Sequence, residues 1–248
     1  PRRENLLGVV DWLLSELQQI SVPIYYDRYM EAKDVLELRA DIVIIATGGI
    51  PNFEFLEFGQ DLVASTWDVL NCQIPLANNI LIYDENGTEV GPSCAEMALK
   101  KGCQVEFITR DRMIGSWIGA TNYPPMLGEI YKGCENVTTD LQLLGIKKKD
   151  GRLEAHLWND YAEKPCIRIY DQIVVEYGTL PNDDIYFDLK SVSKNHGQID
   201  YKELTEFKAQ SLEPNPDGHF RLYRIGDSVA SRNIHASLFD ARRLCQVF

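Results

Sequence analysis

The sequence lacks both an excess of basic residues and any long apolar run. Its 248 residues include 25 Lys and Arg against 37 Asp and Glu, which gives a formal net charge of −12. Binding to nucleic acid or to an anionic membrane needs a cationic surface, so this balance disfavours both partners. The longest apolar runs are of the size of residues 42–46, far below the roughly 20 residues that span a bilayer. Since no secretory signal pattern opens the chain either, we expect a cytoplasmic protein.

Several motifs of catalytic and metal sites are also missing. None of the six cysteines forms a Cys-x-x-Cys pair, so we expect scattered reduced thiols and neither a zinc nor an iron–sulfur site in this chain. Gly-x-Ser-x-Gly, His-Glu-x-x-His and P-loop patterns are absent too. The sequence therefore indicates no catalytic residue and no metal ligand. The cysteines are Cys72, Cys94, Cys103, Cys134, Cys166 and Cys245.

The first 50 residues predict an alternation of helices and strands. Apolar residues recur at helical spacing over 6–17, with Asn5 as the expected N-cap. A short strand is expected to begin at Ile24, and a helix of one or two turns over 31–38. Residues 41–46 are apolar on both faces, as strands of a buried parallel sheet are.

The rest of the chain predicts a βαβ unit, then a β-meander, then a return to α/β structure. Pro75 and Asn78–Asn79 suggest a domain crossover, and residues 137–177 suggest the meander, with Asp150-Gly151 as a hairpin turn. Residues 183–219 are polar and predict loops. The other expected strands are at 80–83, 104–108 and 220–225. The other expected helices are one at 92–101, a short one that ends near Gly133 and a last one that follows Asn233.

Two segments separated by 130 positions repeat one pattern. Residues 41–52 and 171–182 both read as a strand followed by Gly-x-x-Pro-Asn. We expect the two turns to lie side by side, as in a nucleotide-binding sheet interrupted by a second one. The predicted fold is α/β, with two Rossmann-like domains, the second inserted in the first. The expected limits are 1–70 and 169–248 for the outer domain, and 71–168 for the inserted domain with its meander.

A candidate cofactor site follows from this arrangement. Gly226 would let a cofactor approach the backbone, and Asp227 could accept hydrogen bonds from a ribose or ribityl hydroxyl. The next helix would direct free N–H groups at a phosphate or a flavin oxygen, although His235 also fits a simple helix-start histidine. The candidate cofactor-binding residues are Thr47, Gly48, Gly49, Pro51, Gly226, Asp227, Asn233, Ile234 and His235.

These motifs carry a family resemblance. Residues 46–51 and 225–228 resemble the signature turns of flavoproteins that bind two dinucleotides. A narrower resemblance is to the C-terminal part of the trimethylamine dehydrogenase and 2,4-dienoyl-CoA reductase family. It is carried by residues 1–12, 121–124, 177–182 and 225–235. The members of this family are NADH:flavin oxidoreductases related to old yellow enzyme. Within the family, the chain is most similar to the branch that demethylates dimethylglycine or N-methylproline.

The resemblance implies that separate parts of the complete protein hold separate cofactors. In that family an N-terminal barrel holds FMN, a cysteine cluster holds a 4Fe–4S centre, and the C-terminal part holds FAD or ADP. Neither the barrel nor the cysteine cluster is in these residues, and the first βαβ of the FAD-type domain is expected upstream of Pro1. The resemblance therefore implies the nucleotide-binding region of a larger oxidoreductase, unable to demethylate alone. Its implied partners are the FMN barrel domain, an electron-acceptor protein and further copies of the same chain.

The inserted domain fits NAD(P)H poorly. When the third glycine of a Gly-x-Gly-x-x-Gly fingerprint is placed on Gly91, Asn86 and Thr88 take the places of the first two. Asp84 and Glu85 add negative charge where the phosphates would lie. We therefore expect a packing role for this domain. Two alternatives stay open, namely an NAD(P)H-dependent reductase domain and a non-catalytic ADP-binding module.

Overall fold

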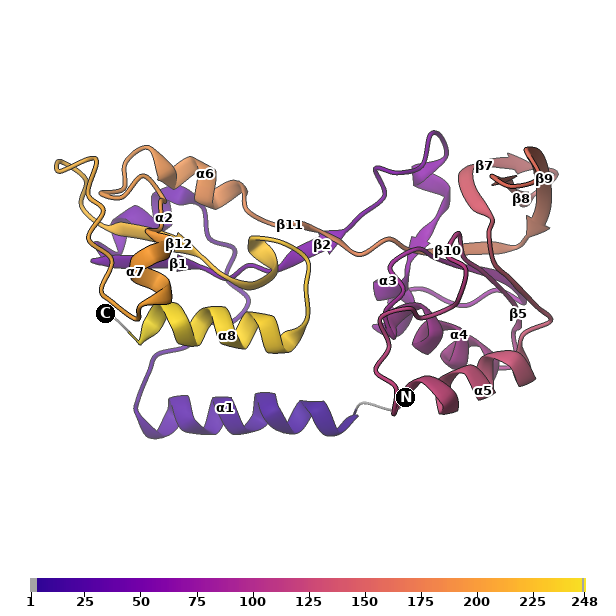
Figure 1. Cartoon of the computed structure of the whole chain (residues 1–248), viewed down its shortest axis with the longest axis horizontal. Helices are drawn as coiled ribbons and strands as arrows, with labels where there is room; N and C mark the ends of the chain where they lie inside the picture. Colours follow the sequence, from indigo (N-terminus) through magenta and orange to yellow (C-terminus); the bar gives the residue numbers. More distant parts are fainter. Residues whose placement is uncertain (1–3, 247) are drawn as a thin grey trace. The chain divides into compact units, whose positions relative to one another are not determined.

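The computed structural model describes residues 4–246 and 248, and its chain divides into two compact units (Figure 1). Unit 1 comprises residues 1–22 and 51–178, and unit 2 comprises residues 23–50 and 179–248. The boundaries between the units lie at 22/23, 50/51 and 178/179, and the last two fall inside the two Gly-x-x-Pro-Asn segments. The suggested crossover near Pro75 lies within unit 1.

Unit 1 is built on a parallel sheet of five strands in the order β3-β10-β4-β5-β6. The central strand β4 is buried from Ile80 to Tyr83, because a parallel sheet is covered on both faces. The mixed α/β class is therefore confirmed. The strands are β3 (Ala64–Ser65), β10 (Gln172–Glu176), β4 (Asn79–Asp84), β5 (Gln104–Ile108) and β6 (Asn136–Thr138).

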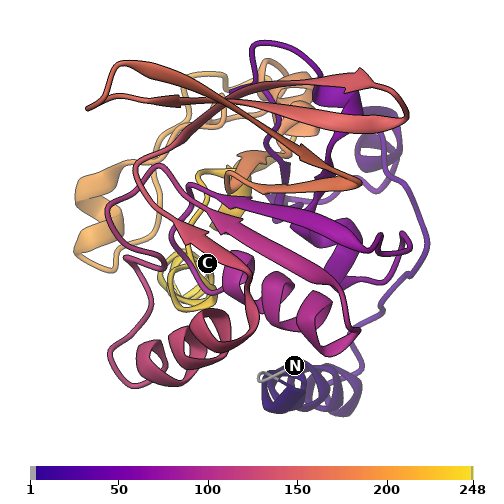
Figure 2. The same ribbon diagram turned by 90° about the vertical axis from the view of Figure 1, so that its right-hand side faces the viewer.

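Helices and a meander cover opposite faces of this sheet (Figure 2). Since successive strand residues point to opposite faces, Ile80 and Ile82 pack with Cys94 and Ala98 of α4 (Val90–Lys100). Leu81 and Tyr83 pack on the meander side. Helices α3 (Thr66–Leu70) and α5 (Tyr123–Gly133) and the short 3-10 helix η2 (Gln60–Leu62) complete the unit.

The meander spans a shorter range of residues than the predicted 137–177. It consists of three antiparallel strands, β7 (Gln142–Lys149), β8 (Arg152–Asn159) and β9 (Lys164–Tyr170). The Asp150-Gly151 turn is confirmed, and both residues have positive φ, of 49° and 80°, as a type I′ hairpin requires. The ends of the predicted meander, β6 and β10, belong instead to the parallel sheet, where β10 is buried.

Unit 2 contains a two-stranded parallel sheet, β1 (Ile42–Ile45) with β12 (Arg221–Arg224). Its core joins Ile45 and Leu222 to residues of α6 (Asp184–Lys190). The region 183–219, predicted as loops, contains α6 and α7 (Tyr201–Thr205), since buried Tyr186 and Leu189 anchor the first of them. The remaining helices are α2 (Ala32–Glu37), η3 (Gly226–Ser228) and α8 (Ile234–Cys245).

The N-terminal helix α1 (Leu7–Gln19) is present as predicted, after a 3-10 turn η1 (Glu4–Leu6). The N-cap position is Leu6 and not Asn5. No residue of α1 is buried, and Trp12 is 60% exposed. The strand expected at Ile24 is not formed: residues 24–26 are exposed, and their backbone pairs with no strand of the described chain. Within residues 4–246, no helix has the length and apolar character needed to cross a membrane.

Gly59 offers a test of the packing between η2 and the meander. Its φ is +79°, and a Cβ there would lie 2.3 Å from the carbonyl oxygen of Ile146 in β7. Gly102 has a similar φ of +83° but open space around its Cβ position. We expect Gly59→Ala to lower the free energy of unfolding by more than about 3 kcal/mol, against about 1 kcal/mol for Gly102→Ala.

Urea denaturation followed by tryptophan fluorescence measures both values, because all four tryptophans lie in unit 1. Equal losses for the two variants would show that the close approach of Gly59 to β7 is absent.

Candidate functional site

The two Gly-x-x-Pro-Asn segments pair with each other. β2 (Gly49–Pro51) and β11 (Thr179–Pro181) form a two-stranded sheet. The Asn182 N–H donates to the Gly48 carbonyl at 3.0 Å, and the Asn52 N–H donates to the Gly178 carbonyl at 3.1 Å. The expectation that these turns lie side by side is thus met, and Pro51 ends the first of the two strands.

The two glycines of the first turn serve different purposes. Gly48 has a φ of +72° with open space at its Cβ position, so the backbone conformation favours glycine there. Gly49 has ordinary φ, but a Cβ would lie 2.8 Å from the Leu180 carbonyl and from the Thr179 side chain. The close approach of β11 therefore requires glycine at position 49.

The carboxyl ends of β1 and β12 bring the predicted residues of unit 2 together. The Ile225 N–H and the Ser228 hydroxyl both donate to the Ile45 carbonyl, at 3.0 and 3.1 Å. The Thr47 hydroxyl donates to the Asn182 carbonyl. Gly226, with φ +65°, begins η3 directly after β12. Ligands of open parallel sheets bind at this end of the strands, so the position suits a cofactor.

Asp227 is half-buried and faces the loop that leads into α8. Its Oδ1 accepts the backbone N–H of Arg232 at 3.1 Å. A carboxylate has about four acceptor positions, so this bond leaves capacity for a hydroxyl of a ligand. Asp227 can therefore shape the loop and contact a sugar at the same time.

The start of α8 provides backbone donors. The Asn233 side chain caps the helix by accepting the Ala236 N–H at 2.9 Å. The N–H groups of Ile234 and His235 have no intrahelical acceptor because of their position in the first turn, and the helix dipole makes this end positive. The His235 ring stacks on Phe239, with ring centroids 6.5 Å apart. It is thus the His235 backbone, and not its ring, that is placed for an anion or a carbonyl oxygen.

Sequence reasoning missed Asp240. Its Oδ2 accepts the Gly226 N–H at 3.1 Å, and it forms an ion pair with Arg232. A Cβ on Gly226 would lie 3.1 Å from the Ser237 hydroxyl, so this glycine also sits against α8. The available signal was spacing, since Ser237 and Asp240 lie three residues apart and share one helix face.

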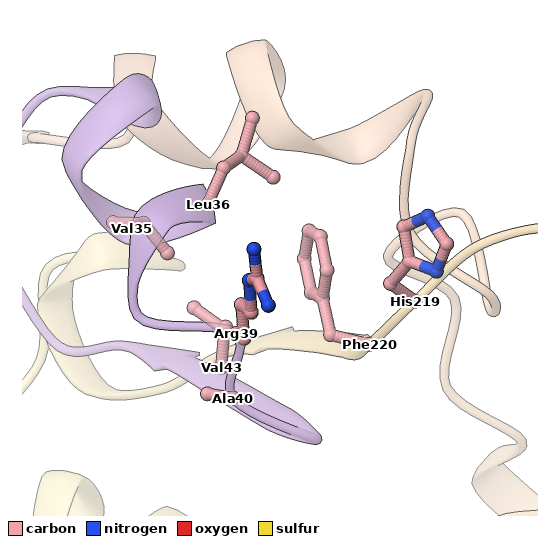
Figure 3. Close-up of a pocket in the computed structure, with 7 residues that line it drawn as sticks. All are labelled: Val35, Leu36, Arg39, Ala40, Val43, His219 and Phe220. Atoms are coloured by element: carbon pink, nitrogen blue, oxygen red, sulfur yellow. The ribbon is translucent and has the colours of Figure 1, made fainter.

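A cavity of about 570 Å³ in unit 2 contains none of the predicted residues (Figure 3). It lies near the start of β12, where Phe220 directly precedes that strand. The Arg39 side chain lies beside the Phe220 ring and below Leu36 in the view of Figure 3. Because ligands of parallel sheets bind at the carboxyl ends, we assign it no cofactor. Its lining residues are Val35, Leu36, Arg39, Ala40, Val43, His219 and Phe220.

Unit 1 buries two carboxyl groups at the carboxyl ends of adjacent strands. Asp84 of β4 and Glu176 of β10 are in register and are 1% and 4% exposed. The Asp84 Oδ1 accepts the N–H groups of Asn86 at 2.9 Å and Gly87 at 3.2 Å. Glu176 accepts the Asn86 side-chain amide at 2.9 Å and the Thr66 hydroxyl. The two carboxyls thus share Asn86 as a hydrogen-bond partner.

Burial disfavours a second charge in this cluster. Desolvation, and next the neighbouring Glu176, raise the pKa of Asp84 from 3.8 to about 7. Burial also raises the pKa of Glu85, which accepts the Tyr83 hydroxyl at 2.5 Å. Among the described residues, no group of three or more His, Cys, Asp or Glu side chains is placed to hold a metal ion.

Comparison with known proteins relates the chain to oxidoreductases. No family model matches it. It is 36% identical to the probable N-methylproline demethylase of Rhizobium meliloti (strain 1021), over 98% of this chain and 36% of that protein. It is 34% identical to the N,N-dimethylglycine/sarcosine dehydrogenase of Chromohalobacter salexigens, over 100% of this chain and 37% of that protein. These are the kinds of relative that the resemblance predicted, and the chain spans little more than a third of their length.

A solved structure matches the fold. The 6-hydroxypseudooxynicotine amine oxidase of Pseudomonas geniculata N1 superimposes with a TM-score of 0.73. The match covers 95% of this chain and 33% of that chain, at 20% identity. At this identity the likeness shows the fold alone.

Asp84→Asn tests the buried carboxyl pair. The folded-state pKa lies above the unfolded value of 3.8, so the Asp84 contribution to stability is full below pH 4 and is lost as pH rises toward 7. Asparagine keeps an acceptor oxygen without titrating. Between pH 4 and pH 7, we expect the free energy of unfolding of the variant to gain a few kcal/mol relative to wild type.

Urea denaturation at several pH values, followed by tryptophan fluorescence, measures this difference. Asp61→Asn, which changes an exposed carboxylate of the same unit, is the control. A constant difference between wild type and Asp84→Asn over this range would contradict the raised pKa.

Proposed function

We propose that this chain is the C-terminal nucleotide-binding region of a flavin-dependent oxidoreductase that acts on an N-methylated amino acid or a similar amine. One observation carries the proposal, namely sequence similarity along 98–100% of the chain to a demethylase and a dehydrogenase of such substrates. The chain covers 36–37% of those relatives. In this proposal the FMN-binding barrel and the 4Fe–4S cluster therefore belong to the part of the protein outside these residues.

The proposed role of unit 2 is to hold FAD or ADP. Asp227 would accept a hydrogen bond from a sugar hydroxyl, and the N–H groups of Ile234 and His235 would face a phosphate or a flavin oxygen. The paired turns at Gly48 and Gly49 would form the neighbouring wall. The positive φ of Gly226 supports this fit, because it favours a residue without a side chain next to Asp227. A bound flavin would supply electron transfer.

Two features support a missing partner segment. Among the described residues β1 pairs only with β12, and a two-stranded sheet is marginal alone. Most apolar residues of α1 are likewise exposed. We propose that an upstream βαβ segment, with a phosphate-binding turn, supplies the strand beside β1. The chain alone would then bind nucleotide weakly and catalyse no demethylation.

The proposed partners follow from the same division. They are the FMN-binding barrel domain, an electron-accepting protein and further copies of the chain. In this scheme unit 2 takes part in electron relay, while oxidation of the substrate occurs at the FMN. Unit 1 is proposed as a second Rossmann-like domain, inserted in the first.

Nucleotide titration tests the proposal. We expect isothermal titration calorimetry with ADP or FAD to detect binding to a chain extended upstream by the βαβ segment. Asp227→Ala in that longer chain should lower the affinity about 10- to 100-fold, because a hydrogen bond to a charged group contributes about 1.5–3 kcal/mol. Asp227→Asn retains an acceptor for the Arg232 N–H and should lose less.

Asp217→Ala, which removes an exposed carboxylate of the same unit, serves as the control. Unchanged affinity in Asp227→Ala would remove Asp227 from the site. Binding of ADP without redox turnover in the complete protein would favour the ADP-binding structural module instead.

A further inference from the structure

The loop after β4 occupies the position at which a doubly wound sheet binds a dinucleotide. From β4 the chain continues through α4 to β5 on one side, and β10 lies on the other side. A sheet binds its ligand at such a reversal of strand order, with phosphate held by the loop and the start of the next helix. In unit 1 this position falls on residues 84–91.

The Asp84 carboxyl fills this position. It accepts the N–H groups of Asn86 and Gly87, two of the backbone donors of the loop. A Cβ on Gly91, at the start of α4, would lie 2.7 Å from the Asp84 Cγ and 2.8 Å from its Oδ2. The carboxyl group therefore lies directly against the glycine that would otherwise face a pyrophosphate.

Glu176 places a second carboxyl beside the first. One of its oxygens accepts the N–H of Gly178 and the side-chain amide of Asn86, both at 2.9 Å. The other accepts the Thr66 hydroxyl. Its hydrogen bonds thus hold β10 and α3 to the loop. A pyrophosphate entering here would have to displace one carboxyl and lie beside the other.

The outer side of the loop is covered by the segment after β5. The Trp117 N–H donates to the Gly87 carbonyl at 2.9 Å. A Cβ on Gly87, whose φ is +65°, would lie 2.5 Å from the Ser116 hydroxyl and 3.2 Å from Trp117 Cδ1. The loop is thus packed on both sides.

The charges around the pair are predominantly negative. Asp111 faces it from the segment after β5, and Glu85 lies in the loop itself. The Cys94 thiol faces it from α4 and adds no charge, because burial raises the pKa of this thiol. The positive charge of Arg110 partly offsets the rise in the pKa of Glu85, and Arg110 also forms an ion pair with Asp160 at 3.0 Å. Among the described residues, no Lys or Arg forms an ion pair with Asp84 or Glu176.

We propose that the Asp84 carboxyl, supported by Glu176, is an internal substitute for the dinucleotide phosphates. The chain fills its own anion site, so unit 1 is a closed domain that binds neither NADH nor NADPH. This inference goes beyond the FAD or ADP site of unit 2, and either can fail without the other.

Backbone NMR of the ¹⁵N-labelled wild-type chain tests the geometry. We expect the amide signals of Asn86 and Gly87 to shift together with pH, with one common midpoint near neutrality, as the carboxyl that accepts them loses its proton. Tyr161 and Ala162 are matched controls, because their N–H groups are accepted by the non-titrating amide oxygen of Asn159 at 3.1 and 2.8 Å. Asn86 and Gly87 signals that are the same in wild type and in Asp84→Asn at every pH would overturn the proposal, because they would show that these N–H groups do not bond to the Asp84 carboxyl.

Titration with dinucleotides and with pyrophosphate tests the consequence that unit 1 binds neither NADH nor NADPH. Wild type should show no change in nicotinamide fluorescence with NADH or NADPH at about 1 mM, whereas a dissociation constant below about 100 μM would overturn the proposal. Inorganic pyrophosphate should raise the melting temperature of Asp84→Ala, in which the two N–H groups are free, but not that of wild type.

Asp111→Ala is the matched control, since it removes a neighbouring charge and leaves the Asp84 hydrogen bonds in place. A folded Asp84→Ala that gains nothing from pyrophosphate counts against the proposal. Should Asp84→Ala fail to fold, the NMR and dinucleotide titrations of wild type still decide it.

Discussion

The hydrogen bonds between β2 and β11 are the constraint on which the account depends. They join two turns that are 130 residues apart in the chain. Gly49 permits this pairing, because any side chain there would strike β11. The same pairing positions Thr47 and Gly48 near the carboxyl ends of β1 and β12, where η3 and α8 begin. Without it, Thr47 and Gly48 would lose their hydrogen bonds with Asn182.

Much of the fold could be predicted from local sequence. The buried run of β4, the Asp150-Gly151 turn and the amphipathic pattern of α1 each encode their element directly. The sequence could not reveal that β6 and β10 leave the meander for the parallel sheet. That assignment depends on pairing with β4 and β5, which are distant in the chain. The pattern at Ile24 likewise predicts a strand, but none forms there, because strand formation depends on a partner strand.

The candidate sites show a similar limit. The repeated turn pattern and Gly226-Asp227 were recognisable because they combine an unusual backbone conformation with a polar side chain. Glu176 was not, since it acts through a contact with Asn86, which is 90 residues away in sequence. Asp240 was missed although its spacing to Ser237 was readable, because its role depends on the contact with Gly226. The missing fingerprint glycines and the acidic charge of the loop at Asp84 suggested poor phosphate binding. The structure adds a more specific reason, which is that the carboxyl already accepts the loop N–H groups.

The central claim is that unit 2 holds an adenine nucleotide or flavin between the paired turns and the start of α8. A crystal structure of the complete protein with ADP or FAD bound tests it most directly. The account predicts the ligand at the carboxyl ends of β1 and β12, with Asp227 hydrogen-bonded to a sugar hydroxyl. A nucleotide bound elsewhere in the protein, with Asp227 contacting only water and the Arg232 N–H, would contradict it.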